Sequence, residues 1–233
     1  MQVTHRNNFS RFLAVSGFAL LALIAWDWGG LDLPLARWFG THQGFALQDN
    51  WLLTAVMHKN AHGLSWAFLG LLTAGIRWPV GPLRKLPLSA RVQLVVTALI
   101  AALAISLLKS VDTTSCPWDL VEFGGSVPYL SHWDRIADGG PGHCFPAGHA
   151  SAGFAFLGGY FVFRPVAPGL ARRWLWGALM AGLILGLSQQ MRGAHFMSHT
   201  LWTGWVCWCI AGALDGAFRA VQSRKSYSLA VGA

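Results

Sequence analysis

The chain has 233 residues, of which 54% are apolar and only 11% are charged. Soluble domains carry about 25% charged residues, so this chain has too few polar side chains to cover the surface of a soluble enzyme. Disorder is excluded, because it requires low hydrophobicity and high charge. The composition and length favour a single membrane-embedded domain that comprises residues 1–233.

Six runs without Asp, Glu, Lys or Arg are long enough, or nearly so, to cross a membrane as helices. A helix needs about 20 apolar residues to cross about 30 Å of hydrocarbon. The runs are residues 12–26 (to about 31 if Asp27 lies at the interface), 60–76, 92–108, 144–163, 174–191 and 194–214. The first run resembles a signal peptide in its basic flank, but no clear cleavage site follows, so we expect a mature helix. The predicted fold is all-α, a bundle of six transmembrane helices.

The charges predict the orientation of this bundle. Six crossings place both termini on one side, which carries 12 of the 17 Lys and Arg residues and is therefore predicted to be cytoplasmic. The net charge of +8 thus indicates topology rather than a nucleic-acid partner. Seven of the nine acidic residues and eight of the nine histidines lie on the other side. We predict a multi-pass protein of the bacterial inner membrane, with cytoplasmic termini and a periplasmic active site.

Four cysteines fall into two pairs. Cys207 and Cys209 lie in the last run, where a small buried apolar role is expected. Cys116 and Cys144 lie on the outer side and could form a disulfide in an oxidising compartment such as the periplasm. Such a bond would tie together the ends of the long outer segment; two separate reduced thiols are the alternative.

Three polar clusters end on this outer face, at residues 109–117, 144–151 and 188–199. His149 and His195 are each expected at or near a helix start, where unpaired N–H groups and the helix dipole favour an anion. Lys109 and Arg192 add positive charge, and a guanidinium can bind two phosphate oxygens at once. These side chains are expected to converge on one pocket.

Two histidines and several cations, without a carboxylate cluster, predict phosphoryl transfer through a covalent phosphohistidine. One His attacks phosphorus and the other protonates the leaving oxygen, which suits a side chain with a pKa near 6.5. Water then releases phosphate. Cations and backbone N–H groups can stabilise the transferred oxygens, so we expect neither a metal nor another cofactor.

The clusters resemble the three motifs of the type 2 phosphatidic acid phosphatase family, which read Lys-x6-Arg-Pro, Pro-Ser-Gly-His and Ser-Arg-x5-His-x3-Asp. The matching segments are Lys109-x6-Cys116-Pro117, Pro146-Ala147-Gly148-His149 and Ser188-Gln189-x5-His195-x3-His199. Their order, the six-span layout and the outer placement also match, so the resemblance covers most of the chain. It implies His195 as the nucleophile and His149 as the general acid, with Lys109 and Gly148 among the phosphate-binding groups.

Both Arg places and the Asp place of these motifs are changed. Arg192 lies three residues after Gln189, on the same helix face, and is a candidate for one missing guanidinium. Arg135, in the outer loop, is a candidate for the other. His199 or Asp112 could accept the hydrogen bond that fixes the tautomer of the nucleophile. The same changes leave open a family member with altered or no hydrolytic activity.

Two groups of histidines are alternative metal sites. The spacing of His132, His143 and His149 is not a recognised ligand pattern. His195 and His199 could chelate zinc on one helix face, but the Glu partner of that motif is absent. We therefore predict no metal site in either group.

The leading hypothesis is a membrane phosphatase that removes phosphate from a lipid phosphate or pyrophosphate in the bilayer. Undecaprenyl pyrophosphate, lipid A and phosphatidylglycerol phosphate are the substrates considered. A lipid phosphotransferase, in which another lipid or alcohol replaces water, is the close alternative, and a non-catalytic lipid-binding protein is a third. A channel or transporter would place ionisable residues deep within the spans, where this sequence has none. No feature of the sequence specifies an oligomeric state.

Overall fold

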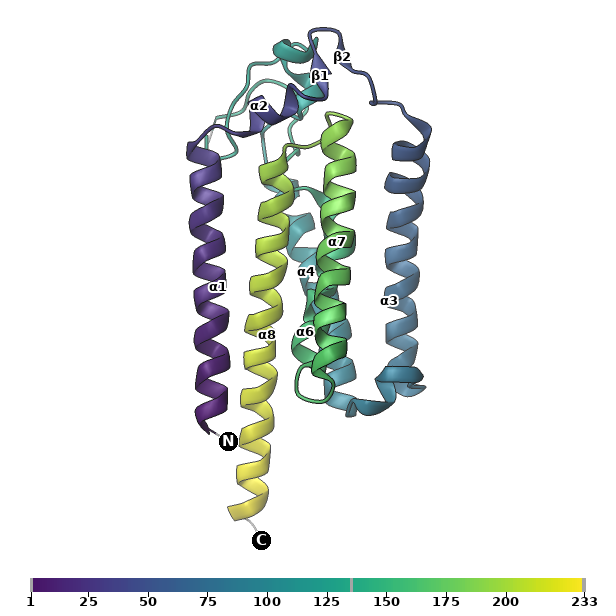
Figure 1. Cartoon of the computed structure of the whole chain (residues 1–233), viewed down its shortest axis with the longest axis vertical. Helices are drawn as coiled ribbons and strands as arrows, with labels where there is room; N and C mark the ends of the chain where they lie inside the picture. Colours follow the sequence, from purple (N-terminus) through teal and green to yellow (C-terminus); the bar gives the residue numbers. More distant parts are fainter. Residues whose placement is uncertain (1, 135, 232–233) are drawn as a thin grey trace.

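The computed structural model describes the backbone of residues 2–134 and 136–231, and their side chains except at 2–8, 58, 59 and 224–231. Five long helices run side by side along the longest axis of the molecule (Figure 1). They are α1 (Gln2–Trp28), α3 (Ala61–Arg77), α4 (Leu88–Val111), α7 (Pro168–Met191) and α8 (Met197–Val231). A further helical rod combines α5 (Gly148–Phe154), a 3-10 turn (Ala155–Leu157) and α6 (Gly158–Phe163).

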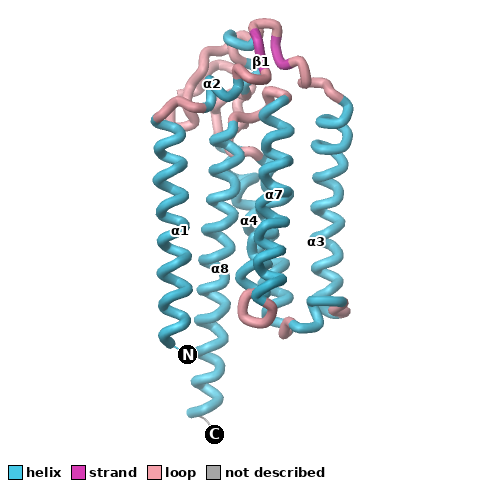
Figure 2. The backbone as a smooth tube through the Cα atoms, viewed as in Figure 1, coloured by secondary structure: helices cyan, strands magenta, loops and turns pink. Residues whose placement is uncertain are grey.

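Most of the loop structure lies at one end of the bundle (Figure 2). This cap contains α2 (Asp32–Ala36), the antiparallel strands β1 (Gly40–Thr41) and β2 (Gly44–Phe45), and the outer segment 112–147. The described residues of the outer segment form two 3-10 turns, Pro117–Asp119 and Val121–Phe123, and an isolated bridge between Leu120 and Val127. A π-helical stretch, Leu52–Asn60, leads into α3, and a 3-10 turn, Gly81–Lys85, joins α3 to α4 at the opposite end.

Each of the six apolar runs of the sequence lies largely in one of these helical rods. Three helices among the described residues are long and apolar enough to cross a membrane: Phe9–Trp28, Leu88–Val111 and Pro168–Met191. The prediction of a mainly helical membrane protein is therefore supported, and the number of six crossings stays a prediction. Helix α8 begins at Met197, three residues later than the predicted run 194–214, and residues 194–196 form a connection before it.

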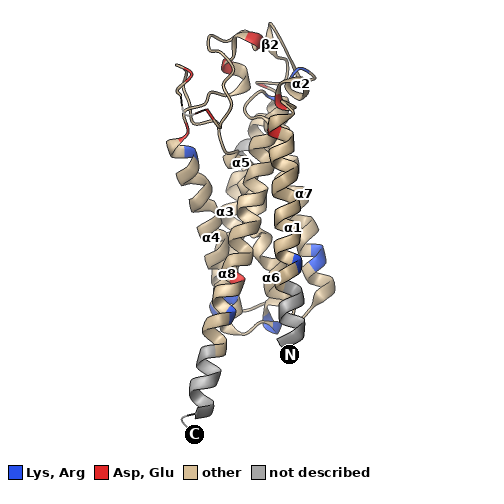
Figure 3. Cartoon of the chain, turned by 90° about the vertical axis from the view of Figure 1, so that its left-hand side faces the viewer, with Lys and Arg blue, Asp and Glu red and all other residues tan. Residues whose placement is uncertain are grey.

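Charged residues are separated along the bundle (Figure 3). Acidic residues gather in the cap, whereas most Lys and Arg residues lie toward the opposite end, where α1 begins and α8 ends. Asp215 is an acidic residue at that opposite end, where it pairs with Arg219 at 2.8 Å and lies 3.7 Å from Arg164. The separation agrees with the orientation that the sequence predicts.

Two carboxylates, Asp27 in the last turn of α1 and Asp32 at the start of α2, attach the cap to the bundle. Asp32 is buried and accepts hydrogen bonds from the Ser198 backbone (3.0 Å) and hydroxyl in the first turn of α8, which caps that helix. Asp27 accepts hydrogen bonds from the indoles of Trp133 and Trp202, each at 2.9 Å. Asp27 thereby joins α1, the outer segment and α8.

The core consists of two apolar clusters. The larger one is shared by the helices of the bundle, and the smaller one lies within the cap, where Phe45 and Phe123 are buried together with Phe196. Helix α5 packs directly on α7, because Gly153 brings its backbone against Gly182. Small residues allow such close approach between helices in a membrane.

This close approach predicts that Gly153→Ala destabilises the protein. An added methyl group would overlap the backbone of Gly182, and overpacking of this kind costs roughly 1–3 kcal/mol. Gly177→Ala in α7 is the matched control, since a methyl group there meets no atom within 4 Å. We expect a lower apparent melting temperature in detergent for Gly153→Ala only, and equal values for the two variants would contradict the packing.

Candidate active site

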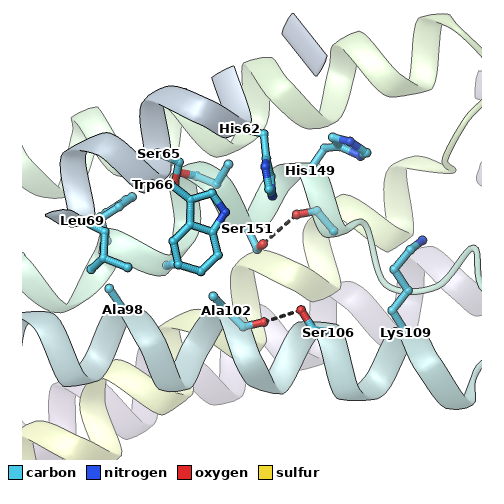
Figure 4. A pocket seen from close by; sticks show the side chains of 14 residues that line it. His62, Ser65, Trp66, Leu69, Ala98, Ala102, Ser106, Lys109, His149 and Ser151 are labelled. Atoms are coloured by element: carbon cyan, nitrogen blue, oxygen red, sulfur yellow. Dashed lines mark hydrogen bonds between the residues drawn. The ribbon is translucent and has the colours of Figure 1, made fainter. Parts of the chain in front are cut away.

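A cavity of about 210 Å³ lies between α3, α4 and α5, next to the cap (Figure 4). Lys109 and His149 lie toward one end of it, and Trp66, Leu69 and Ala98 lie toward the other. Gly148 belongs to the lining as well. The cavity is therefore basic and polar at one end and apolar at the other.

Lys109 lies in the last turn of α4 and is held by the outer segment. Its ammonium group donates a hydrogen bond to the carbonyl of His143, and the ring Nδ1 of His143 lies 3.0 Å from the carbonyl of Lys109. The backbone N–H of His143 also donates to the carbonyl of Asp112 at 3.1 Å. These contacts keep the ammonium group at the cap end of the cavity.

His195 is placed beside His149 by the tight turn between α7 and α8. Gly193 adopts a left-handed conformation (φ 77°) after the end of α7, as helix C-termini often require. The ring centroids of His149 and His195 lie 6.2 Å apart, and His195 is 3% exposed. Burial, and secondarily the charge of Lys109, lower the pKa of His195 well below its ordinary value of 6.5, although a hydrogen bond to the Cys144 backbone opposes the shift. The ring is therefore neutral at pH 7, as a nitrogen nucleophile must be.

Cys116 and Cys144 are joined in a disulfide with their Cα atoms 5.1 Å apart. Cys144 Sγ lies 3.6 Å from Nδ1 of His195, and the carbonyl of Cys144 lies 3.1 Å from Nδ1 of His199. The His199 ring thus bonds to the backbone of Cys144 through Nδ1, and its ring centroid lies 5.9 Å from that of His195.

The two residues proposed to orient the nucleophile are therefore engaged elsewhere. The carboxylate of Asp112 accepts hydrogen bonds from the Thr114 hydroxyl (3.0 Å) and the Phe145 N–H (2.8 Å). It fixes the segment that precedes His149 rather than contacting His195. Among the described residues, Cys144 is the group that contacts Nδ1 of His195. The contacting atom is the sulfur of a cysteine 51 residues away in the chain, so no local pattern around His195 could have indicated this contact.

Arg192 does not line the cavity. Its guanidinium donates hydrogen bonds to the carbonyl of Gln48 (2.8 Å) and the side chain of Gln189 (3.0 Å), and lies 5.9 Å from the ring centroid of Trp118. The expected convergence of four side chains is thus incomplete: Lys109 and His149 line the cavity, whereas Arg192 does not, and His195 lies beside His149 without being one of the lining residues. Arg135 lies outside the described residues. A phosphate-binding role for either Arg stays a prediction.

The sequence did not indicate that the His132 side chain is buried against Asp27, next to His199. His132 lies 3.3 Å from Asp27, stacks on Phe145 at 4.2 Å and approaches the His199 ring at 5.7 Å, each of the last two measured between centroids. Asp27, an acidic residue at the end of an apolar run, was the available signal, since such residues are costly to bury without a partner. Its partner is more than a hundred residues away in the chain.

One group among the described residues brings three metal-binding atoms within 4.8 Å of one another, namely those of Cys116, Cys144 and His195. The two sulfurs are bonded to each other, so in this state neither can act as a thiolate ligand.

The sequence model of one protein family, the PAP2 superfamily, matches residues 90–222, which is more than half of the chain. The chain belongs to the PAP2 superfamily. This match confirms the resemblance carried by the three clusters, all of which lie within it, whereas α1 and α3 lie outside it. No curated protein and no solved structure matches the chain. PAP2 superfamily proteins are generally phosphatases, which supports an enzyme that acts on phosphoric esters.

The burial of His195 predicts a pH-dependent contribution to stability. A histidine in the unfolded chain titrates near pH 6.5, and the folded protein binds fewer protons below that pH because the pKa of His195 is lowered. The free energy of unfolding must therefore fall as pH decreases from about 6.5 toward the folded pKa. We expect the apparent melting temperature of the wild type to fall more between pH 7 and pH 5 than that of His195→Gln. Equal slopes would show that His195 is not buried in its neutral form.

Proposed function

We propose that this protein is an integral membrane lipid phosphatase that removes phosphate from a lipid phosphate or pyrophosphate through a phosphohistidine intermediate. The cavity of Figure 4 is the observation that carries the proposal. It combines a lysine and a histidine at the cap end with an apolar floor, which matches a charged headgroup joined to a hydrocarbon tail.

His195 is the proposed nucleophile. Its Nδ1 faces Cys144, so we assign the attack to Nε2. Nε2 forms a bond to phosphorus while the bond from phosphorus to the leaving oxygen breaks, and His149 gives its proton to that oxygen. His149 then takes a proton from water as the water attacks phosphorus and releases inorganic phosphate from His195. Lys109 and the N–H of Gly148 are the groups proposed to stabilise the transferred oxygens, and no metal is required by this scheme.

The lining of α4 supports a lipid rather than a soluble substrate. Ala98, Ala102, Ser106 and Lys109 follow one face of the helix along the cavity, and 11 residues of helix span roughly 17 Å. A second, largely apolar cavity of about 440 Å³ lies between α3, α5 and α7 and shares the lining residue Phe156 with the first. Apolar space therefore flanks α3 on both sides.

The proposed location is the bacterial inner membrane, with cytoplasmic termini and the site at the periplasmic face. The separation of charge along the bundle supports this orientation (Figure 3). The disulfide beside the site supports an oxidising compartment, where such bonds form and persist. Undecaprenyl pyrophosphate, lipid A and phosphatidylglycerol phosphate are the substrates to test.

His195→Ala and His149→Ala are each expected to lower the kcat of phosphate release strongly. Without His195 the covalent route is lost, which predicts a fall in kcat of more than about 10³-fold. Loss of a general acid predicts a fall of about 10²- to 10⁴-fold. The measurement is release of inorganic phosphate from the three lipids in detergent, in the presence of EDTA.

His42→Ala is the control, because His42 is an exposed histidine in the cap and should leave turnover unchanged. Wild-type turnover by His195→Ala would refute the mechanism. Loss of wild-type turnover in EDTA, with recovery on adding a divalent metal, would refute its metal independence.

A lipid phosphotransferase is the second candidate, and the larger apolar cavity favours it by providing room for a second lipid beside the first. The phosphohistidine would then be attacked by a hydroxyl of that lipid instead of water. Donor lipid labelled in its phosphate distinguishes the two reactions, since a phosphatase yields free phosphate and a transferase yields a new phospholipid.

Ala102→Phe is expected to discriminate against long lipid tails. The new ring would fill the middle of the cavity, between the polar end and the apolar end. We expect KM to rise at least about tenfold for a long-chain lipid phosphate and to stay within about twofold for a short-chain analogue, as loss of apolar contacts worth about 1.4 kcal/mol would produce. Leu103→Phe, at the neighbouring exposed position of α4, is the control. An equal effect on both substrates would place the tail elsewhere.

A further inference from the structure

We infer that the Cys116–Cys144 disulfide is a positioning element for the nucleophile, so that phosphate release requires the oxidised pair. The inference rests on the proposed function of His195. The disulfide is not one of the groups proposed to contact the substrate.

Cys144 contacts both histidines of the third cluster. Its Sγ lies 3.6 Å from Nδ1 of His195 and 3.3 Å from the carbonyl oxygen of Ala194. Its own carbonyl accepts the hydrogen bond from His199. The residue is fully buried, so these contacts are enclosed on every side.

Cys116 attaches the other strand of the outer segment to the same place. Two residues after it, the N–H of Trp118 donates to the carbonyl of Gly193 at 3.0 Å, just ahead of His195. The disulfide therefore links two segments that both touch the turn between α7 and α8. In the related motif an Arg stands at the place of Cys116, and here a covalent bond toward the nucleophile occupies that place.

Reduction would disturb this arrangement without removing the fold of the cap. A reductant supplies two electrons and two protons, the S–S bond breaks, and each cysteine becomes a thiol. The two sulfurs can then no longer lie at bonding distance, and the enclosed Cys144 sulfur must move against His195 or Ala194. Its new S–H also becomes a donor facing Nδ1 of His195.

Hydrogen bonds would still hold the outer segment after reduction. The N–H of Cys144 donates to the carbonyl of Thr114 at 3.0 Å. The N–H and hydroxyl of Ser115 donate to the buried carboxylate of Asp138 at 2.6 and 2.8 Å. Loss of activity on reduction would therefore reflect the position of His195 rather than unfolding.

The test uses the whole chain in detergent, with phosphatidylglycerol phosphate, one of the three lipids named above, in mixed micelles as the probe. Activity is measured before and after treatment with a phosphine reductant, with EDTA present because the freed thiols and His195 could bind a contaminating metal. We expect kcat to fall at least tenfold, KM to change less than about threefold, and kcat to recover on reoxidation. The acid limb of kcat/KM should also move, since the surroundings of His195 change.

Two double variants show whether the loss of activity on reduction comes from the Cys116–Cys144 bond. Cys207→Ser/Cys209→Ser removes the two free cysteines and should keep both the activity and its loss on reduction. Cys116→Ser/Cys144→Ser should have the low kcat of the reduced enzyme and should not respond to reductant. Circular dichroism and gel filtration establish that each form is folded.

The outcomes separate the inference from the function. If oxidised protein releases phosphate in a His195-dependent manner and Cys116→Ser/Cys144→Ser retains full kcat and an unchanged pH profile, the inference is wrong and the function stands. If oxidised protein releases phosphate equally well with His195→Ala, the proposed function fails first. Retained kcat in reduced protein with four titratable thiols would overturn the inference as well.

Discussion

The contacts of Cys144 hold the outer segment against the turn between α7 and α8 and the start of α8, beside both candidate catalytic histidines. Its sulfur meets His195, its carbonyl meets His199 and its N–H bonds to Thr114. His149, five residues later, is the second residue of the next helix, α5. A loop with little regular structure can position side chains for chemistry only if its backbone polar groups are satisfied within the protein. The carboxylates of Asp112 and Asp138 accept hydrogen bonds from backbone N–H groups of this loop, and the disulfide fixes two of its segments to each other.

The helices of the bundle carry Lys109 and His149, and the cap holds the segments around them in place. Close packing of α5 on α7 through Gly153 fixes the helix whose first turn contains His149. Asp27 and Asp32 then attach α1 to the same end of the bundle, although α1 lies outside the part of the chain that the family model matches. A helix beyond the matched region therefore stabilises the surroundings of the site.

The environment of His195 combines burial with a nearby cation, and both favour its neutral form. The same burial that costs stability in acid keeps a nitrogen available for attack at neutral pH. Lys109 lowers the pKa of His195, and in the proposed mechanism it also stabilises the negative charge of the phosphate. The apolar floor below it extends the cavity into the bundle, where a hydrocarbon tail would be more stable than a water-filled space.

The sequence by itself determined the membrane character, the helical runs, the family and the residues of the three clusters, because hydrophobic length, charge placement and local spacing are properties of contiguous segments. It could not place Arg192, whose guanidinium is held by Gln48 from the cap, nor find His132 beside Asp27. It also could not show that Cys144, rather than His199 or Asp112, contacts Nδ1 of His195. Only the tertiary structure decided these contacts, since they join segments far apart in the chain, and the contact of Arg192 uses a backbone carbonyl that every residue carries.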